Sequence, residues 1–278
     1  MIYLVLAVLC SAMVSIFMRL SEQKIKGRLS MLSVNYGVCL LLAVIFAGSN
    51  MPALQPQDIP STFTMGTING IFYVLGFVLL QVSVRKNGVV LSTIFMRLGL
   101  LVPMVMSIFL FREMPGIYQG IGFFFALAAI MFISYDKNTA PGGSKTTLTL
   151  LLLAGGSADA MAKVFDQLGN PACNDHFLLC TFIVAMLLCL IFGALKNEKP
   201  GFWEVLFGVL IGLPNFFFAK LLLEALGELR AVVVYPTYSV GTLLVVTLFG
   251  VVVFREKLKL LQWLAVGIIV IALILLNM

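Results

Sequence analysis

The sequence predicts an all-α integral membrane protein with ten transmembrane helices, arranged as two inverted five-helix repeats. Three observations support this prediction: an apolar composition, ten long apolar runs, and a residue pattern that recurs in the second half. Of the 278 residues, 61% are hydrophobic and only 11% are charged, whereas soluble domains usually carry about 25% charged residues. A water-soluble fold of this size could not bury so much apolar surface, so the lipid bilayer is the expected solvent.

Ten apolar runs are each long enough to cross a hydrocarbon core of about 30 Å at 1.5 Å per residue. They cover approximately residues 2–20, 30–48, 63–84, 88–111, 115–135, 147–165, 176–195, 202–224, 231–254 and 258–277. Turn residues separate several of them, such as Pro141-Gly142-Gly143 and Pro200-Gly201. The first run lacks a preceding basic segment, so we expect a spanning helix there and not a cleaved signal peptide.

The distribution of Lys and Arg predicts the orientation. Of the 18 basic residues, thirteen lie in the connections that follow odd-numbered runs: Arg19, Lys24, Lys26, Arg28, Arg85, Lys86, Lys137, Lys145, Lys196, Lys199, Arg255, Lys257 and Lys259. The opposite connections hold only Arg112 and Arg230. Because basic residues in short loops stay in the cytoplasm, we expect a multi-pass protein of the cytoplasmic (inner) membrane with both termini outside. The net charge of +6 therefore marks topology, and no nucleic-acid partner is expected.

The two halves, residues 1–138 and 146–278, carry related patterns. Phe111-Arg112-Glu113 closes the fourth run and Phe254-Arg255-Glu256 closes the ninth, and a glutamine follows each glutamate by six residues. Five runs per half is an odd number, so the second half enters the membrane from the opposite side. The basic loops switch accordingly, as inverted repeats require. The alternative is that short Arg-Glu helix ends recur by chance.

The five-plus-five organisation and the closing segment, from Ala231 through Pro236 to Gln262, resemble the ten-helix EamA-type branch of the drug/metabolite transporter superfamily. The opening segment, Ile2 to Glu22, also resembles the first helix of the small multidrug resistance proteins. This resemblance implies a transporter that moves a small-molecule substrate across the bilayer. In the small multidrug resistance proteins, a glutamate in that helix couples protons to cationic drugs. The matching residue here is Ser11, with Gly155 in the second half, so cation export by that route is not expected.

Charged residues inside the runs are the first candidates for function, because a charge in lipid is costly. Arg97 lies roughly 14 Å beyond the start of the fourth run, where a guanidinium would suit a substrate carboxylate or phosphate. The alternative is a structural arginine, either paired or reaching toward the interface. Asp159 and Lys163 share one face of the sixth run. They predict either a local ion pair or a coupling site that binds a proton.

Uncharged polar residues near the middle of several runs predict the rest of a solute site. A small-solute pocket needs a few convergent polar groups, although each such residue could instead hold helices together. Besides Arg97, the predicted substrate-binding residues are Asn35, Tyr36, Asn69, Tyr73, Asn215, Tyr235 and Tyr238. Pro103, Pro214 and Pro236 are expected to kink their helices and to free backbone carbonyls.

The leading hypothesis is a secondary active transporter of a small organic metabolite, either an anion or a zwitterion such as an amino acid, that works by alternating access. Energy would come from a coupling proton or from solute exchange, and no cofactor is expected. The alternative within transport is a broad-specificity exporter of drugs or toxic compounds. A membrane-embedded lipid-modifying enzyme would need a histidine–carboxylate or metal constellation. One histidine, His176, and five cysteines without a Cys-x-x-Cys offer little for either, so we predict no enzymatic activity.

Overall fold

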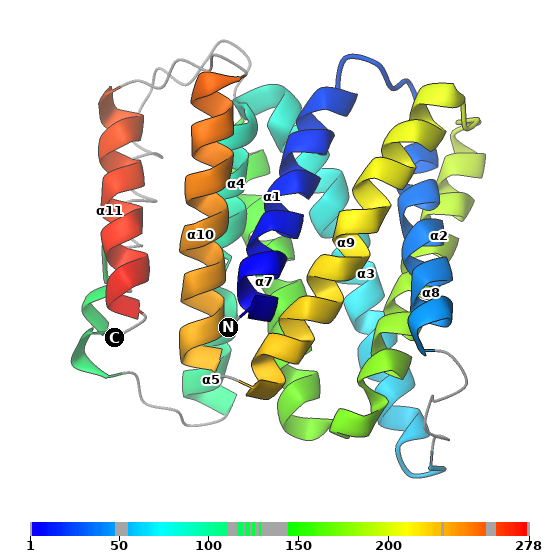
Figure 1. Cartoon of the computed structure of the whole chain (residues 1–278), viewed down its shortest axis with the longest axis horizontal. Coiled ribbons are helices and arrows are strands. Elements are labelled where there is room, and N and C mark those ends of the chain that lie inside the picture. Colours follow the sequence, from blue (N-terminus) through cyan, green and yellow to red (C-terminus); the bar gives the residue numbers. More distant parts are fainter. Residues whose placement is uncertain are drawn as a thin grey trace.

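The computed structural model describes residues 2–47, 55–99, 101–110, 116–118, 120–122, 124–125, 128, 144–228, 231–253 and 260–276. Within these ranges every regular element is a helix (Figure 1), which confirms the predicted all-α class. Six helices contain a stretch that is long and apolar enough to cross a membrane. They are α1 (Ile2–Ser21), α2 (Arg28–Ala47), α3 (Ile59–Asn87), α7 (Lys145–Leu168), α8 (Asn174–Leu195) and α9 (Phe202–Glu228).

Shorter elements complete the described chain. They are α4 (Val89–Leu98), α5 (Leu101–Leu110), the 3-10 turn η2 (Pro171–Cys173), α10 (Ala231–Val252) and α11 (Leu260–Leu276). Nine of the ten predicted runs overlap one of these helices. The fifth predicted run, residues 115–135, lies mostly outside the described residues, so a total of ten spans stays a prediction.

The fourth predicted run is divided into two helices, because α4 ends at Leu98 and α5 begins at Leu101. Pro103 has no N–H with which to bond the carbonyl of Gly99, four residues earlier. That carbonyl accepts the N–H of Val102 instead, at 2.8 Å, in a tighter turn. Gly99 also packs so closely on α7 that a Cβ would lie 2.8 Å from the backbone nitrogen of Gly156. A single span over residues 88–111, with a kink at Pro103, stays a prediction because residue 100 lies outside the described residues, whereas α9 continues through its Pro214.

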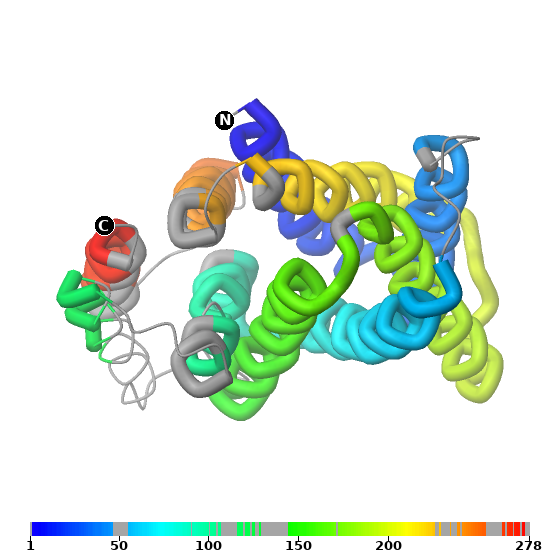
Figure 2. The backbone as a smooth tube through the Cα atoms, turned by 90° about the horizontal axis from the view of Figure 1, so that it is seen from below, coloured from blue at the N-terminus to red at the C-terminus, as the bar shows by residue number. Residues whose placement is uncertain are grey.

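Helices of one half pack mainly against helices of the other half. α9 contacts both α1 and α2, and α3 contacts both α7 and α8. α2 also packs on α8, and α10 contacts α1, α4 and α11. Figures 1 and 2 show this mixing, with α9 beside α1 and α2 on one side of the molecule and α3 beside α7 and α8 on the other. The interior is therefore built from both halves together.

Two glycine pairs allow close approaches between the halves. At each of these glycines a Cβ would lie 2.6–2.8 Å from an atom of the facing helix, so a larger residue would push the helices apart. The glycines and the residues they face are Gly66 with Cys180, Gly70 with Val184, Gly208 with Val34, and Gly212 with Val38. The two glycine pairs lie 142 residues apart in sequence, and the residues they face lie 146 residues apart. The α3–α8 and α9–α2 contacts thus use matching positions.

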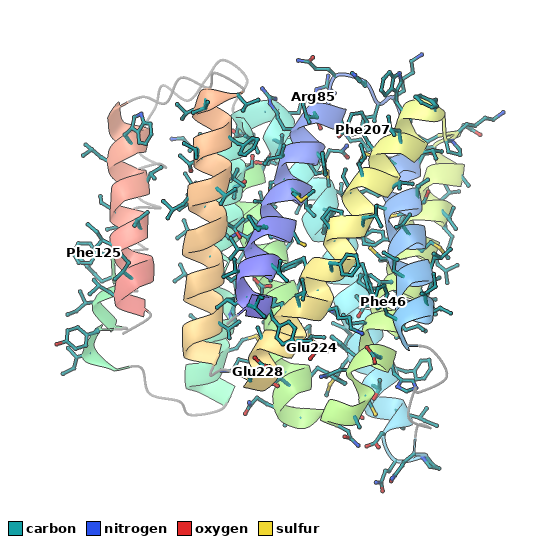
Figure 3. All side chains as sticks on the ribbon, in the orientation of Figure 1. Phe46, Arg85, Phe125, Phe207, Glu224 and Glu228 are labelled. Carbon is teal, nitrogen blue, oxygen red and sulfur yellow. The ribbon has the colours of Figure 1, made fainter. Side chains whose placement is uncertain are left out.

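The two ends of the helical bundle differ in charge. One end, here called the basic end, contains residues 22–27 and 196–201 together with Arg85 at the end of α3 (Figure 3). The other end, here called the distal end, contains Glu224 and Glu228 of α9 (Figure 3). The start of α1 and the end of α11 also lie at the distal end (Figure 1).

Candidate functional site

Arg97 of α4 forms the centre of a polar cluster in the interior. Its side chain is only 4% exposed. The guanidinium donates a hydrogen bond to Ser11 Oγ of α1 and lies 4.2 Å from the ring centre of Tyr238 of α10. Ser11 Oγ and Tyr238 Oη are 3.4 Å apart. Three helices, from both halves of the chain, therefore converge on one positive charge.

Arg97 has capacity for a further partner. Its Nε atom is buried and has no hydrogen-bond partner among the described residues. A buried donor on a charged group that stays unpaired is unfavourable. The group that a guanidinium binds best is a carboxylate or phosphate, often through two parallel hydrogen bonds. The face of the guanidinium against Tyr238 is already occupied by the ring, which stabilises the cation and leaves the guanidinium edge for an anion.

Asp159 of α7 is the acidic group of the same region. Its charge interacts with that of Arg97, and it also acts on Tyr73 of α3. Asp159 and Tyr73 are both partly exposed, so neither is sealed in the core. Lys163, one turn further along α7, is partly exposed as well. Arg97, whose charge acts on Asp159, comes from another helix, and the predicted coupling role of Asp159 and Lys163 stays a prediction.

Tyr73 also belongs to a group of aromatic rings that extends away from these charges. It stacks on Phe77 with ring centroids 6.3 Å apart and meets Phe182 of α8 edge-on at 6.1 Å. Tyr36 contacts the other side of this group, edge-on to Phe77 at 5.9 Å. Tyr36 is fully buried, and its hydroxyl has no hydrogen-bond partner among the described residues. Tyr73 therefore links the charged cluster to an aromatic region that includes Tyr36.

The three predicted asparagines lie in contacts between helices of different halves. Asn69 Nδ2 donates to Thr181 Oγ1 at 3.2 Å, and Asn215 Nδ2 donates to Asn35 Oδ1 at 3.3 Å. All of these side chains are buried, as the helix-packing alternative anticipates. Asn35 Nδ2 and Asn69 Oδ1 lack partners within the described part of the chain. A direct role in binding a solute would use these two atoms, and it stays a prediction.

The structure thus brings Arg97, Tyr238, Tyr73 and Asp159 into one region. The side chain of Tyr235 lies outside the described part of the structure. Ser11 was not among the predicted substrate-binding residues, although the resemblance to the small multidrug resistance proteins had singled out its position. Its contact with Arg97 assigns it to the site.

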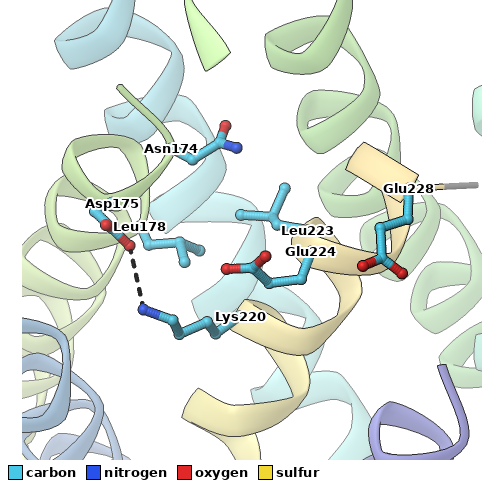
Figure 4. Close-up of a pocket in the computed structure, with 7 residues that line it drawn as sticks. All are labelled: Asn174, Asp175, Leu178, Lys220, Leu223, Glu224 and Glu228. Carbon is cyan, nitrogen blue, oxygen red and sulfur yellow. Dashed lines mark ion pairs between the residues drawn. The ribbon is translucent and has the colours of Figure 1, made fainter. Parts of the chain in front are cut away.

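A separate cavity of about 330 Å³ lies at the distal end, between α8 and α9. It is lined by Asn174, Asp175, Leu178, Lys220, Leu223, Glu224 and Glu228 (Figure 4). Lys220 extends toward Asp175, and Lys220 Nζ lies 3.7 Å from Asp175 Oδ1 (Figure 4). With three carboxylates and one lysine, this cavity carries the opposite charge to the basic end.

Comparison with known proteins identifies the family. A model of the EamA-like transporter family matches residues 1–135 and 149–278, which is nearly the whole chain. The chain belongs to the EamA-like transporter family. It is therefore an integral membrane protein of the drug/metabolite transporter superfamily, whose members move small molecules across lipid bilayers.

Two relatives extend this comparison of the EamA-like transporter. An uncharacterized protein of Haemophilus influenzae is 23% identical over 276 residues, covering 95% of this chain and 93% of the relative. A protein of known crystal structure is similar with a TM-score of 0.65 and 14% identity, covering 99% of this chain and 94% of that chain. At such low identity the structural likeness shows the fold alone, and it extends along nearly the full length.

Proposed function

We propose that this EamA-like transporter is a secondary active carrier that moves a small carboxylate-bearing metabolite, an anion or a zwitterion, by alternating access across the cytoplasmic membrane. The observation that carries the proposal is Arg97. Its guanidinium is buried among membrane-spanning helices, is held by Ser11 and Tyr238, and has an unpaired Nε. A substrate carboxylate would bind this group and complete its hydrogen bonding.

The serine at position 11 favours a substrate with a negatively charged group. The small multidrug resistance proteins, which the first helix resembles, have a glutamate at this position, and a glutamate suits a cation. Here the hydroxyl of Ser11 accepts a hydrogen bond from Arg97, so a positive group occupies the region where those relatives have a negative one. Because charge interactions strengthen away from water, this change favours a carboxylate over a cationic drug.

Among carboxylate-bearing substrates, the carboxylate of Asp159 favours a zwitterion. An amino-acid-like solute has a carboxylate and an ammonium group separated by one carbon. Arg97 on α4 would bind the carboxylate, and Asp159 on α7 would bind the ammonium group or, in its absence, a coupling proton. Arg97 and Asp159 act electrostatically on each other, which supports binding of both charged groups of one solute.

Alternating access by two inverted halves is supported by the helix packing. If α1, α2 and α3 correspond to α7, α8 and α9, the contacts of α9 with α1 and α2 correspond to those of α3 with α7 and α8. The matched glycine contacts follow the same rule, and the family match divides between the halves, at residues 136–148. Equivalent halves can exchange conformations, so that a central site faces each side in turn. The positive-inside rule then places the basic end in the cytoplasm and both termini outside.

The test begins with a thermal-stabilisation screen of the purified protein against anionic, zwitterionic and cationic metabolites. Flux of each hit is then measured in proteoliposomes. We expect a carboxylate-bearing hit whose saturable flux falls about 100-fold in Arg97→Ala, since losing one charged hydrogen-bond pair removes about 3 kcal/mol. Arg97→Lys should recover only part of this flux, because an ammonium group cannot bind a carboxylate with a planar pair of donors. Arg85→Ala, which removes an exposed arginine from the basic end, is the matched control and should keep normal flux.

Two results would contradict the proposal. Saturable flux of lipophilic cations that Arg97→Ala leaves unchanged would favour a drug exporter instead. Conversion of a lipid or solute without net movement across the membrane would indicate an enzyme.

A further inference from the structure

We infer that Glu198 and Glu204 form the cytoplasmic gate of the carrier, and that the structure is a conformer closed at this gate. The inference rests on the proposed function, because a gate has meaning only in a carrier that alternates between two sides. It is carried by the hydrogen bonds of these two carboxylates and by the packing of the residues behind them.

Glu198 and Glu204 join the two halves across the basic end. Both come from the second half, Glu198 from the α8–α9 connection and Glu204 from the first turn of α9. Glu204 Oε1 accepts from the backbone N–H of Lys26 at 2.7 Å and of Gly27 at 3.2 Å, and Glu198 Oε2 accepts from the backbone N–H of Leu29 at 2.8 Å and of Ser30 at 3.4 Å. The acceptors are charged and the donors include the free N–H groups at the start of α2, which is a favourable combination.

The distal end has a corresponding but weaker connection. Asn170, after α7, donates from Nδ2 to Asp58 Oδ2, just before α3, at 3.1 Å. In the proposed repeat Asn170 corresponds to Lys26, and Asp58 lies at the start of α3 as Glu204 lies at the start of α9. Among the described residues, one side-chain hydrogen bond joins these two connections at the distal end, whereas four carboxylate–backbone bonds join their counterparts at the basic end.

The packing behind these two connections is also looser at the distal end than at the basic end. At the distal end, the start of α8 and the end of α9 enclose the cavity of about 330 Å³. The matching residues at the basic end, on α2 and α3, are packed: Leu29 is 7% exposed, whereas its counterpart Asp175 has a side chain 42% exposed. Gln81 is 0% exposed whereas its counterpart Leu223 is partly exposed, and Leu32 and its counterpart Leu178 are both buried. Within the described residues, the distal end therefore encloses a cavity beside positions whose counterparts at the basic end are packed.

Gln81 indicates why the closed basic end can open. Both polar atoms of its amide are buried without a hydrogen-bond partner in the described part of the chain, which is unfavourable in the closed state. Opening the space between α2 and α3 would hydrate this amide. The carboxylate bonds stabilise the closed state and the buried amide opposes it, so the two conformers can be close enough in free energy to exchange.

The experiment uses cysteine reporters in membrane vesicles of both orientations, labelled with a membrane-impermeant maleimide. Gln81→Cys reports opening at the basic end, and Leu223→Cys reports opening at the distal end. The same backgrounds without the added cysteine measure labelling of the five native cysteines. In Glu198→Ala/Glu204→Ala we expect Gln81→Cys labelling from the cytoplasmic side to rise about tenfold, which corresponds to about 1.4 kcal/mol. Labelling of Leu223→Cys from outside should fall in the same variant.

Asp58→Ala is the matched control at the distal end, and it should not raise labelling of Gln81→Cys. Glu204→Gln should give an intermediate rise, because an amide oxygen still accepts hydrogen bonds without the charge. If the double variant does not fold, the test of the gate rests on Glu204→Gln alone, and this variant must raise labelling of Gln81→Cys. The inference is overturned if the glutamate variants leave Gln81→Cys labelling unchanged, or if Asp58→Ala raises it equally. Failure of the proposed function is a separate result: labelling would shift as expected while no carboxylate-bearing solute is transported.

Discussion

In the first half of the chain, α1 carries the buried hydroxyls of Ser11 and Ser15, and α4 carries Arg97. In the second half, the positions of α7 that match the two serines are Gly155 and Asp159, and α10 contributes the ring of Tyr238. The helices correspond in their packing, but the groups they bring to the interior differ in charge and size. Under the proposed repeat and site, the comparison teaches that the repeated residues set the scaffold, while the departures from the repeat carry the chemistry.

The backbone departs from the repeat at the same place. The helix of the fourth predicted run breaks locally at Gly99, two residues after Arg97, whereas α10 runs without interruption from Ala231 to Val252. The difference lies in the neighbour, because Gly99 contacts Gly156 of α7 where neither residue has a side chain. The first-half residue that matches Gly156 is Ala12, which already carries a Cβ. Substitutions at these unequal positions test how far the comparison extends.

The largest expected effect is on stability and comes from Gly156→Leu. A Cβ at Gly156 would clash with the carbonyl oxygen of Gly99 and with the side chain of Val102. Overpacking of this kind costs up to about 3 kcal/mol, so we expect the melting temperature in detergent to fall by on the order of 10 °C. Gly76→Ala is the control, because its Cβ would meet no atom closer than 3.9 Å. Equal melting temperatures for the two variants would remove the close contact as the cause of the break.

A smaller, selective effect is expected from Asp159→Asn. If Asp159 binds the ammonium group of a zwitterion, its loss should lower zwitterion flux about 100-fold while changing the flux of a simple carboxylate only a few-fold. Uptake of matched substrate pairs in proteoliposomes measures this difference. Asp166→Asn, at an exposed position near the end of α7, is the control. An equal loss for both substrates would assign Asp159 to coupling and not to substrate recognition.

The cross-half hydrogen bonds of Asn69 and Asn215 test whether the halves are equivalent in stability. Interhelical hydrogen bonds in membrane proteins contribute about 0.6 kcal/mol on average. We therefore expect Asn69→Ala and Asn215→Ala each to lower the melting temperature by about 1–2 °C. A much larger loss for one variant would show that the two contacts are not equivalent.

The last effect depends on pH and concerns Glu22, beyond the end of α1, for which the second half has no buried equivalent: the matching Asp166 is exposed. Burial raises the pKa of the Glu22 carboxyl, and Arg28, Arg85 and Arg19 oppose the rise only in part. Because the pKa of Glu22 is raised in the folded state, this carboxyl favours the folded state when it is protonated. Its contribution to folding stability is complete below the unfolded-state pKa and is lost as the pH rises through the folded-state pKa. Glu22→Gln removes this dependence. The melting temperature of Glu22→Gln relative to the unmodified protein should therefore rise between about pH 4 and pH 7, by no more than about 2–4 °C. A constant difference across this range would contradict the assignment.

Much of the scaffold could be predicted from sequence, because it depends on apolar run length. Nine of the ten predicted runs overlap a described helix within a few residues, apart from the break at Gly99. That break needed two features that are distant in sequence, Pro103 on one helix and Gly156 on another. A single run gives no signal for a neighbour that it meets only after folding.

The candidate site was predictable in part for a similar reason. A lone charge in an apolar run is conspicuous, so Arg97 and Asp159 were found. Ser11 was noted only as the position that matches a glutamate in the small multidrug resistance proteins, and its role as a partner of Arg97 is seen only in the folded structure. Likewise, Glu204 contacts the backbone of Lys26 across 178 residues of sequence, and no local pattern predicts such a pairing.

The glycine contacts between α3 and α8 have a consequence for biogenesis. Gly66 and Gly70 face residues that the ribosome adds more than a hundred positions later. During synthesis these two glycines have no packing partner until α8 has been made, so we expect the α3–α8 contact to form late in assembly.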